Sequence, residues 1–175
     1  GVQTCALPIW PYDIGVFALK SFDTQTALDE LVATGYEVPT ILSLQNGVDN
    51  EPTIAATLGA DKVIAGTVAT AVSKPGVGEV VEEKHRGIGV ALGHPLAQPL
   101  VEALDRAGLS GKAFDDAPSM KWSKLLTNLT GNATSAILDE TVAELFADKR
   151  SYAIEVAVLA ECLAVMKAKG YRVVD

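Results

Sequence analysis

Hydrophobic runs alternate with helical patterns over the first two thirds of the chain. Apolar or β-branched runs predict strands at 12–19, 40–45 and 62–72. Between them, apolar residues recur at helical spacing over 22–34 and again up to Gly59. Strands that are hydrophobic on both faces and separated by helices predict a parallel sheet with right-handed crossovers.

The following segment predicts an edge to that sheet. Residues 78–92 read as two short strands around His85-Arg86-Gly87, forming a hairpin at the edge. An amphipathic helix over 96–107 and a last strand at 112–114 complete this part. The exposed tip of such a hairpin is the favoured place for His85 and Arg86.

Strand patterns end near residue 116, where we place a domain boundary. Asp116 can cap a new helix and Pro118 suits its first turn. Three helical segments follow, at 117–138, 141–148 and 149–169. We expect Glu155 and Glu161 to lie on the solvated edge of the last helix.

The composition suits a packed core but not a nucleic-acid or membrane partner. Of the 175 residues, 49% are hydrophobic and the formal charge is −8. Binding to phosphates or anionic lipids needs a basic face, and no apolar run reaches the ~20 residues of a bilayer span. Cys5 and Cys162 are far apart and lack zinc-ligand spacing, so we expect a cytoplasmic protein without disulfide or metal site.

Polar residues line one side of the predicted helix 117–138. At about 100° per residue, Lys121, Asn128 and Asn132 fall within roughly 80° of Lys124, opposite a leucine-rich side. A solvent-exposed stripe is one explanation, but such stripes usually pair glutamate with lysine, and this one holds no acid. Lysine with amides suits an anionic ligand, and lysine can protonate an oxygen that gains negative charge.

Further polar residues follow two predicted strands, where an open parallel sheet collects its ligands. Lys20 ends the first strand, and Gln45-Asn46-Gly47 follows the second. Taken alone, Asn46-Gly47 suits a plain turn and Lys20 an ordinary surface position.

The order of these segments resembles the ketopantoate reductase (2-dehydropantoate 2-reductase) family from about residue 12 to 170. The matching segments are ALKSFDT, ILSLQNGVDNE, GTVATAV, RGIGVALG, KWSKLLTNLTGN and ATSAIL. The combination of LQNG with W-x-K-L-x-x-N-x-x-x-N is much more specific than a lone glycine motif. The resemblance implies a partial Rossmann-type sheet over 11–116 and the start of an all-helical domain, like that of 6-phosphogluconate dehydrogenase, over 117–175.

The resemblance also implies an activity: NADPH-dependent reduction of 2-dehydropantoate to pantoate, a step towards coenzyme A. Lys124 matches the general acid, Asn128 and Asn132 match substrate-binding residues, and Lys20 and Asn46 match residues that contact the cofactor. A homodimer is compatible with the family. Other 2-oxo acid reductases, β-hydroxyacid dehydrogenases, and a non-catalytic dinucleotide sensor or scaffold are the alternatives.

The chain also departs from the family pattern. It has no GxGxxG loop to hold a pyrophosphate and lacks the family's later helices, so we expect poor NADPH binding and little turnover from these 175 residues alone. The opening GVQTCALPI resembles a translated sequencing adapter. We therefore predict a non-native leader over 1–10, which the codons of the source genome would test.

Overall fold

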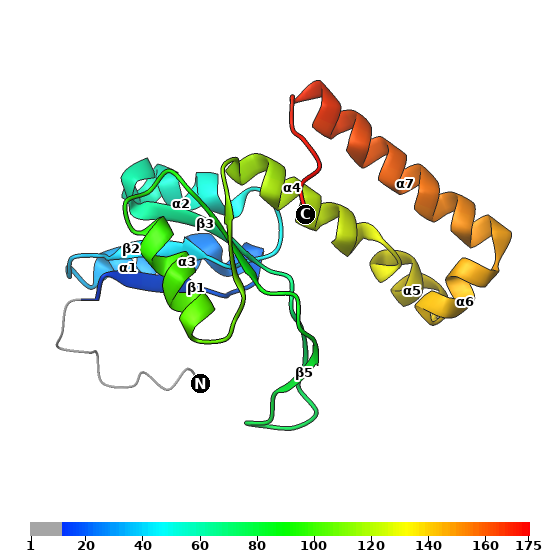
Figure 1. The fold of residues 1–175 in the computed structure, drawn as a ribbon, viewed down its shortest axis with the longest axis horizontal. Helices are drawn as coiled ribbons and strands as arrows, with labels where there is room; N and C mark the ends of the chain where they lie inside the picture. Colours follow the sequence, from blue (N-terminus) through cyan, green and yellow to red (C-terminus); the bar gives the residue numbers. More distant parts are fainter. Residues whose placement is uncertain (1–11) are drawn as a thin grey trace.

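A five-stranded sheet forms the first part of the protein (Figure 1). The computed structural model describes residues 12–175, so the predicted leader lies outside the described residues. In spatial order the strands are β1 (Ile14–Phe17), β2 (Thr40–Ser43), β3 (Val63–Val68), β6 (Ile88–Ala91) and β7 (Gly111–Phe114). β1, β2 and β3 are parallel, β6 runs antiparallel to β3, and β7 is parallel to β6. The α/β fold is confirmed, with one antiparallel pairing inside the sheet.

Helices cover both faces of this sheet because alternate strand residues point to opposite sides. The helices are α1 (Thr24–Ala33), α2 (Asn50–Leu58) and α3 (Ala97–Arg106), and 3-10 turns at Ser21–Asp23 and Ala60–Lys62 precede α1 and β3. Ile41 of β2 packs with α1 and α2, whereas its neighbour Leu42 packs with α3 on the other face. Both side chains are almost fully buried, as the two-sided hydrophobic pattern predicted.

The segment between β3 and β6 differs from the prediction. The run 62–72 is not one strand: β3 ends at Val68, and β4 (Ala71–Ser73) leaves the sheet. β4 pairs with β5 (Val81–Lys84) in a separate two-stranded hairpin, which projects away from the sheet in Figure 1.

The predicted hairpin over 78–92 is therefore wrong. β5 does not pair with β6, and β6 is an inner strand of the sheet rather than its edge. Gly87 separates the two strands with φ +97°, a conformation that a residue with a side chain rarely adopts. The exposed VEEK of β5 and the mostly buried IGVA of β6 show why one strand leaves the core and the other enters it.

The second part of the protein is helical (Figure 1). Its helices are α4 (Ala117–Leu129), α5 (Asn132–Leu138), α6 (Val142–Ala147) and α7 (Lys149–Ala168). The predicted single helix over 117–138 is two helices, because Thr130 is extended (ψ 108°) and Gly131 is left-handed (φ 76°). Met120 at the start of α4 packs against Ala65 and Ala91 and so joins this part to the sheet.

Glu155 of α7 is buried rather than on a solvated edge, where only Glu161 lies. The Glu155 carboxylate accepts the N–H of Gly131 at 2.7 Å, and bonds from Thr134 and Gly131 hold its pKa below the usual value. The acid therefore satisfies the backbone donor that the break between α4 and α5 leaves free.

Capping also differs at the start of α4. Asp116 occupies the N-cap position and Pro118 lies in the first turn, as predicted. The Asp116 carboxylate, however, accepts the hydroxyl of Ser119 instead of a backbone N–H.

Candidate functional site

Polar residues from several strands meet at one rim of the sheet. The carboxyl ends of β1 and β2 lead to Lys20 and Asn46. Because β6 runs antiparallel to β3, the amino ends of β6 and β7 lie at this same rim, and they carry Arg86 and Ser110. Helix α4 packs against β3 and β6 and brings its own polar residues to the rim.

Asn128 of α4 touches the loop that follows β2. Its Nδ2 donates to Oδ1 of Asn46 at 3.1 Å, across 82 residues of sequence. Asn132, at the start of α5, donates through Nδ2 to the backbone oxygen of Asn128 at 2.6 Å. The structure therefore brings Asn46, Asn128 and Asn132 together, although a helix break separates the last two.

Buried polar residues hydrogen-bond to the loop that carries Asn46. Gln45 donates to Thr24 Oγ1 at 2.8 Å and to the backbone oxygen of Leu19 at 3.2 Å. Thr24 donates to Asn50, and the Asn50 amide donates to the backbone oxygen of Asn46 at 2.8 Å. These buried bonds fix the backbone beneath Asn46, because breaking one would leave polar groups without partners.

Lys121 does not belong to the polar stripe in which the sequence placed it. Its side chain is 5% exposed, and Nζ donates to the backbone oxygens of Gln45 (2.7 Å) and Gly66 (3.2 Å). Nζ also lies 2.8 Å from Glu51 Oε1, which makes a largely buried ion pair. The helix face itself holds no acid, as predicted, but Lys121 is not available to a ligand because Glu51 of α2 pairs with it.

Lys124, one turn further along α4, is half-buried and lines a cavity of about 550 Å³. Burial lowers its pKa below 10.5, and the nearby positive charge of Arg86 lowers it further. Both effects disfavour the ammonium form, so Lys124 is a stronger acid than a free lysine. A larger cavity of about 720 Å³ lies against Trp122 and Tyr171, and Lys124 does not line it. Asn46, Asn128 and Asn132 line neither of the two cavities.

Lys20 is exposed at the carboxyl end of β1, immediately before the 3-10 turn that leads into α1. Within residues 12–175 its side chain makes no hydrogen bond with Asn46 and no ion pair with a carboxylate. It shares the rim with Asn46 because the bond from Gln45 to the backbone of Leu19 links the two loops.

Sequence reasoning missed the roles of Lys121, Glu51 and the network around Thr24. Lys121 falls on the polar side of an ideal helical wheel, and nothing near it in sequence indicates a buried acid. The one available signal was the density of amides and acids in QNGVDNE, which is higher than a plain turn requires.

Sequence models of a known family match both parts of the chain. The model described as ketopantoate reductase PanE/ApbA matches residues 4–93, and the model described as ketopantoate reductase PanE/ApbA C terminal matches residues 116–175. The chain belongs to the ketopantoate reductase family. The resemblance drawn from LQNG and the α4 motif is confirmed.

Individual relatives and a solved structure carry the name of the same family. The chain is 28% identical to a 2-dehydropantoate 2-reductase of Mesorhizobium japonicum, over 91% of this chain and 56% of the relative. It is 29% identical to one of Archaeoglobus fulgidus, over 91% and 54%. The crystal structure of a PanE/ApbA family ketopantoate reductase from Ralstonia eutropha matches with TM-score 0.82 and 29% identity, over 93% of this chain and 54% of that one. The chain thus spans about half the length of the curated relatives it matches.

A dehydrogenase with another name shares the fold. D-mandelate dehydrogenase, solved in complex with NADH, matches with TM-score 0.78 and 20% identity, over 92% of this chain and 55% of that one.

Of the helices between residues 12 and 175, none combines the length and hydrophobicity that a bilayer crossing requires.

Proposed function

We propose that this chain carries the proton-donating and substrate-binding half of an NADPH-dependent reductase that converts 2-dehydropantoate to pantoate. The contact between Asn128 and Asn46 is the observation that carries the proposal. It brings the amide side of α4 to the sheet rim, one turn from a half-buried lysine. Family membership supports the same reaction, since the curated relatives are named for it.

Lys124 is the proton donor in this proposal. Reduction of a ketone places negative charge on its oxygen, and a positioned acid lowers the barrier by supplying a proton there. A lysine pKa lowered by burial and by Arg86 moves the acid closer to the working pH. Asn128 and Asn132, fixed by their bonds to Asn46 and to the α4 backbone, would orient the substrate beside the ammonium group.

Lys20 and Asn46 would contact the cofactor. Their exposed side chains stand at the carboxyl ends of adjacent parallel strands, which is where this class of sheet binds dinucleotides, so an ammonium and an amide group fit the oxygen-rich cofactor. NADPH supplies the hydride to the carbonyl carbon when it is bound. D-mandelate dehydrogenase, solved with NADH, supports a nicotinamide cofactor and makes other 2-oxo acids the competing substrates.

The proposal is tested by Lys124→Ala in the longest reading frame that contains this sequence. We expect 2-dehydropantoate-dependent oxidation of NADPH to fall by about 100-fold or more, because general acid catalysis contributes about 10²–10⁴ in rate. Lys149→Ala, at an exposed position in α7, is the control and should keep full activity. A Lys124→Ala enzyme with wild-type turnover would show that Lys124 is not the acid.

A further inference from the structure

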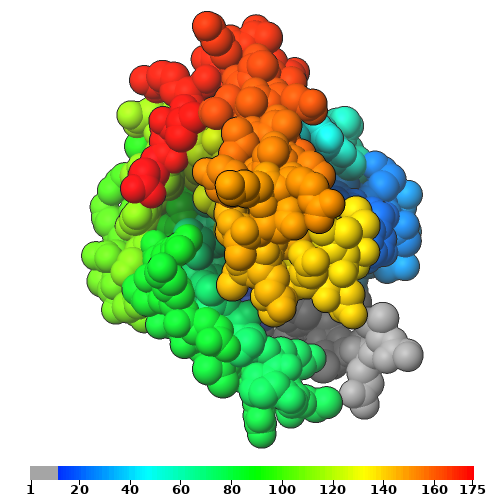
Figure 2. Space-filling view, turned by 90° about the vertical axis from the view of Figure 1, so that its right-hand side faces the viewer, coloured from blue at the N-terminus to red at the C-terminus, as the bar shows by residue number. Residues whose placement is uncertain are grey.

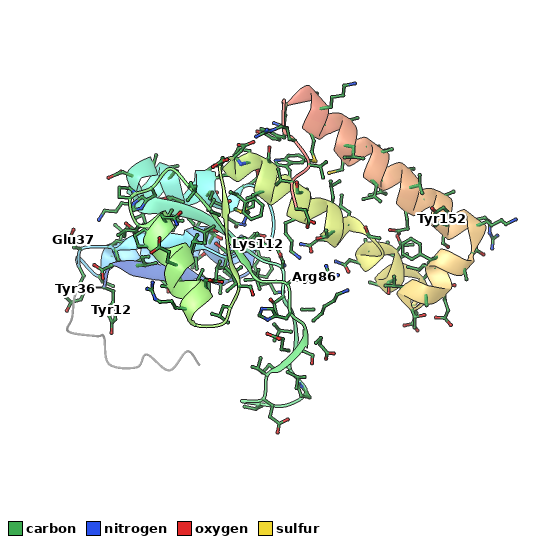
Figure 3. All side chains as sticks on the ribbon, in the orientation of Figure 1. Tyr12, Tyr36, Glu37, Arg86, Lys112 and Tyr152 are labelled. Carbon is green, nitrogen blue, oxygen red and sulfur yellow. The ribbon has the colours of Figure 1, made fainter. Side chains whose placement is uncertain are left out.

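Three cationic side chains, Lys124 among them, line the cavity of about 550 Å³. Lys124 comes from α4, Arg86 precedes β6, and Lys112 belongs to β7 (Arg86 and Lys112 are labelled in Figure 3). One acidic residue, Asp175, also lines the cavity. Across residues 12–175, none of the three cations has a carboxylate partner within 4.0 Å. Their charges are therefore available to an anionic ligand.

The backbone at Arg86 is held in place. The N–H groups of Arg86 and Gly87 both donate to Thr70 Oγ1, at 3.1 and 2.9 Å. The neighbouring His85 ring lies between Glu82 Oε2 (3.0 Å) and Ser110 Oγ (2.8 Å), which ties the end of β5 to the turn before β7. These four contacts fix the backbone around Arg86. The Arg86 guanidinium itself has no hydrogen-bond partner in the described part of the chain.

The walls of the cavity suit a small organic acid. Phe114, Met120 and Val174 line it with apolar side chains, together with Thr67 and Thr127. Its volume of about 550 Å³ lies within the range of small-molecule sites. A fully hydrated inorganic ion would gain nothing from the apolar wall, whereas a carboxylic acid with a hydrocarbon part would use both.

Arg86 and Lys124 repel each other unless an anion lies near both. The positive charge of Arg86 contributes to the lowered pKa of Lys124, so the two charges interact across the cavity. In a 2-oxo acid the carboxylate is bonded directly to the ketone carbon. A group that binds the carboxylate must therefore stand close to the group that protonates the ketone oxygen.

We propose that Arg86, assisted by Lys112, binds the carboxylate of the 2-oxo acid substrate while Lys124 faces its ketone oxygen. The planar guanidinium offers two parallel N–H donors that match the two carboxylate oxygens. Arg86 thereby selects 2-oxo acids over neutral ketones. The inference rests on the proposed function, because it takes Lys124 as the proton donor.

The test measures binding and turnover separately. In the longest reading frame that contains this sequence, Arg86→Gln is compared with Arg86→Lys and with Arg106→Gln, an exposed arginine of α3 that undergoes the same charge change. The ligands are 2-dehydropantoate, its neutral lactone, which keeps the ketone and loses the carboxylate, and inorganic phosphate. Calorimetry gives each dissociation constant, and NADPH oxidation gives KM and kcat.

We expect Arg86→Gln to bind the substrate acid about 10- to 100-fold more weakly, with a matching rise in KM, which is the range for a lost charge-assisted bond. Affinity for the lactone should not change, Arg86→Lys should restore part of the loss, and Arg106→Gln should behave as wild type. Thermal unfolding of each variant verifies folding, which the exposure of Arg86 should leave intact.

The alternatives are distinguishable. Unchanged affinity for 2-dehydropantoate in Arg86→Gln, an equal loss of acid and lactone, or tighter binding of phosphate than of the acid would each overturn the carboxylate site. If the acid binds through Arg86 but no turnover occurs with Lys124 intact, the carboxylate site stands and the reductase function fails. If turnover occurs with a KM independent of Arg86, the reductase stands and the carboxylate site fails.

Discussion

At the scale of single residues, two lysines one turn apart on α4 have opposite environments. Lys121 is buried against Glu51 and two backbone carbonyls, whereas Lys124 is half-buried beside Arg86 without a carboxylate partner among the described ion pairs. The first can stabilise the junction between helix and sheet, and the second can exchange a proton. Sequence spacing treats the two as equivalent.

Lys124 should react as an acidic lysine. Competitive labelling with acetic anhydride across pH, read by mass spectrometry, should give it a pKa below 10.5, since burial and Arg86 both disfavour its charged form. Arg86→Gln should raise that pKa, and Arg106→Gln should not. An unchanged pKa in Arg86→Gln would mean that burial alone lowers it.

Lys121 should contribute strongly to stability. Lys121→Met leaves the Glu51 carboxylate buried without its cation, so we expect a loss of about 3–5 kcal/mol in the free energy of unfolding by urea. Glu51→Leu in addition should recover much of that loss. Arg150→Met, which removes the exposed ion pair with Asp148, is the control and should lose little stability. Additive effects of the two substitutions at 121 and 51 would show that the pair is not coupled.

At the scale of elements, the break between α4 and α5 depends on a distant helix. Gly131 takes a left-handed conformation, and its N–H group would lack a partner without the carboxylate of Glu155 in α7. The break redirects the chain so that Asn132 begins a new helix while still bonding to Asn128. A helical pattern that continues through 129–132 cannot show this, because the partner lies 24 residues away.

Glu155 should make stability depend on pH in the acid range. Its folded pKa lies below 4.5, so its contribution is present above the unfolded value near 4.5 and is lost as the pH falls through the folded pKa. Glu155→Gln should therefore unfold with a weaker pH dependence below about pH 4.5 in urea titrations. Glu161→Gln, exposed on the same helix, should keep the wild-type dependence. If the free energy of unfolding of wild type and of Glu155→Gln fell equally as the pH is lowered, the role of this bond would be contradicted.

At the scale of the whole molecule, the helical part exposes large apolar residues on three of its helices. Figure 2 views the protein with α7 across its front. Exposed large apolar residues of α5, α6 and α7 are Ile137, Leu138, Val142, Phe146, Tyr152, Ile154, Val156, Leu163 and Val165. Tyr152, Val156 and Leu163 lie within about 40° of one another around α7, and exposed apolar residues on one side of a helix favour contact with other protein.

The 175-residue chain should therefore self-associate through α7. Sedimentation velocity should show a sedimentation coefficient that rises with protein concentration. Val156→Gln with Leu163→Gln, two exposed positions about 20° apart on the helix, should weaken the association and keep the helical content. Val77→Gln with Val80→Gln, at two exposed positions in the β4–β5 connection, is the control and should not alter association. A monomer at all concentrations would contradict the expectation.

The sequence by itself determined the alternation of strands and helices up to β3, the change to an all-helical second part, and the polar residues that follow β1 and β2. Those features depend on local periodicity and on turn residues, which act over a few positions. The family motif added Lys124, Asn128 and Asn132 as a set, because motif spacing is also local.

Tertiary structure alone decided the insertion of β6 between β3 and β7, the burial of Lys121 and Glu155, and the cavity that joins Arg86 to Lys124. Each depends on groups that are distant in sequence: Lys121 bonds to Gln45 across 76 residues, and Asn128 bonds to Asn46 across 82. A helical wheel gives the direction of a side chain relative to its own helix. The surface that packs against that helix determines whether the same direction leads to solvent, to a buried acid or to a binding cavity.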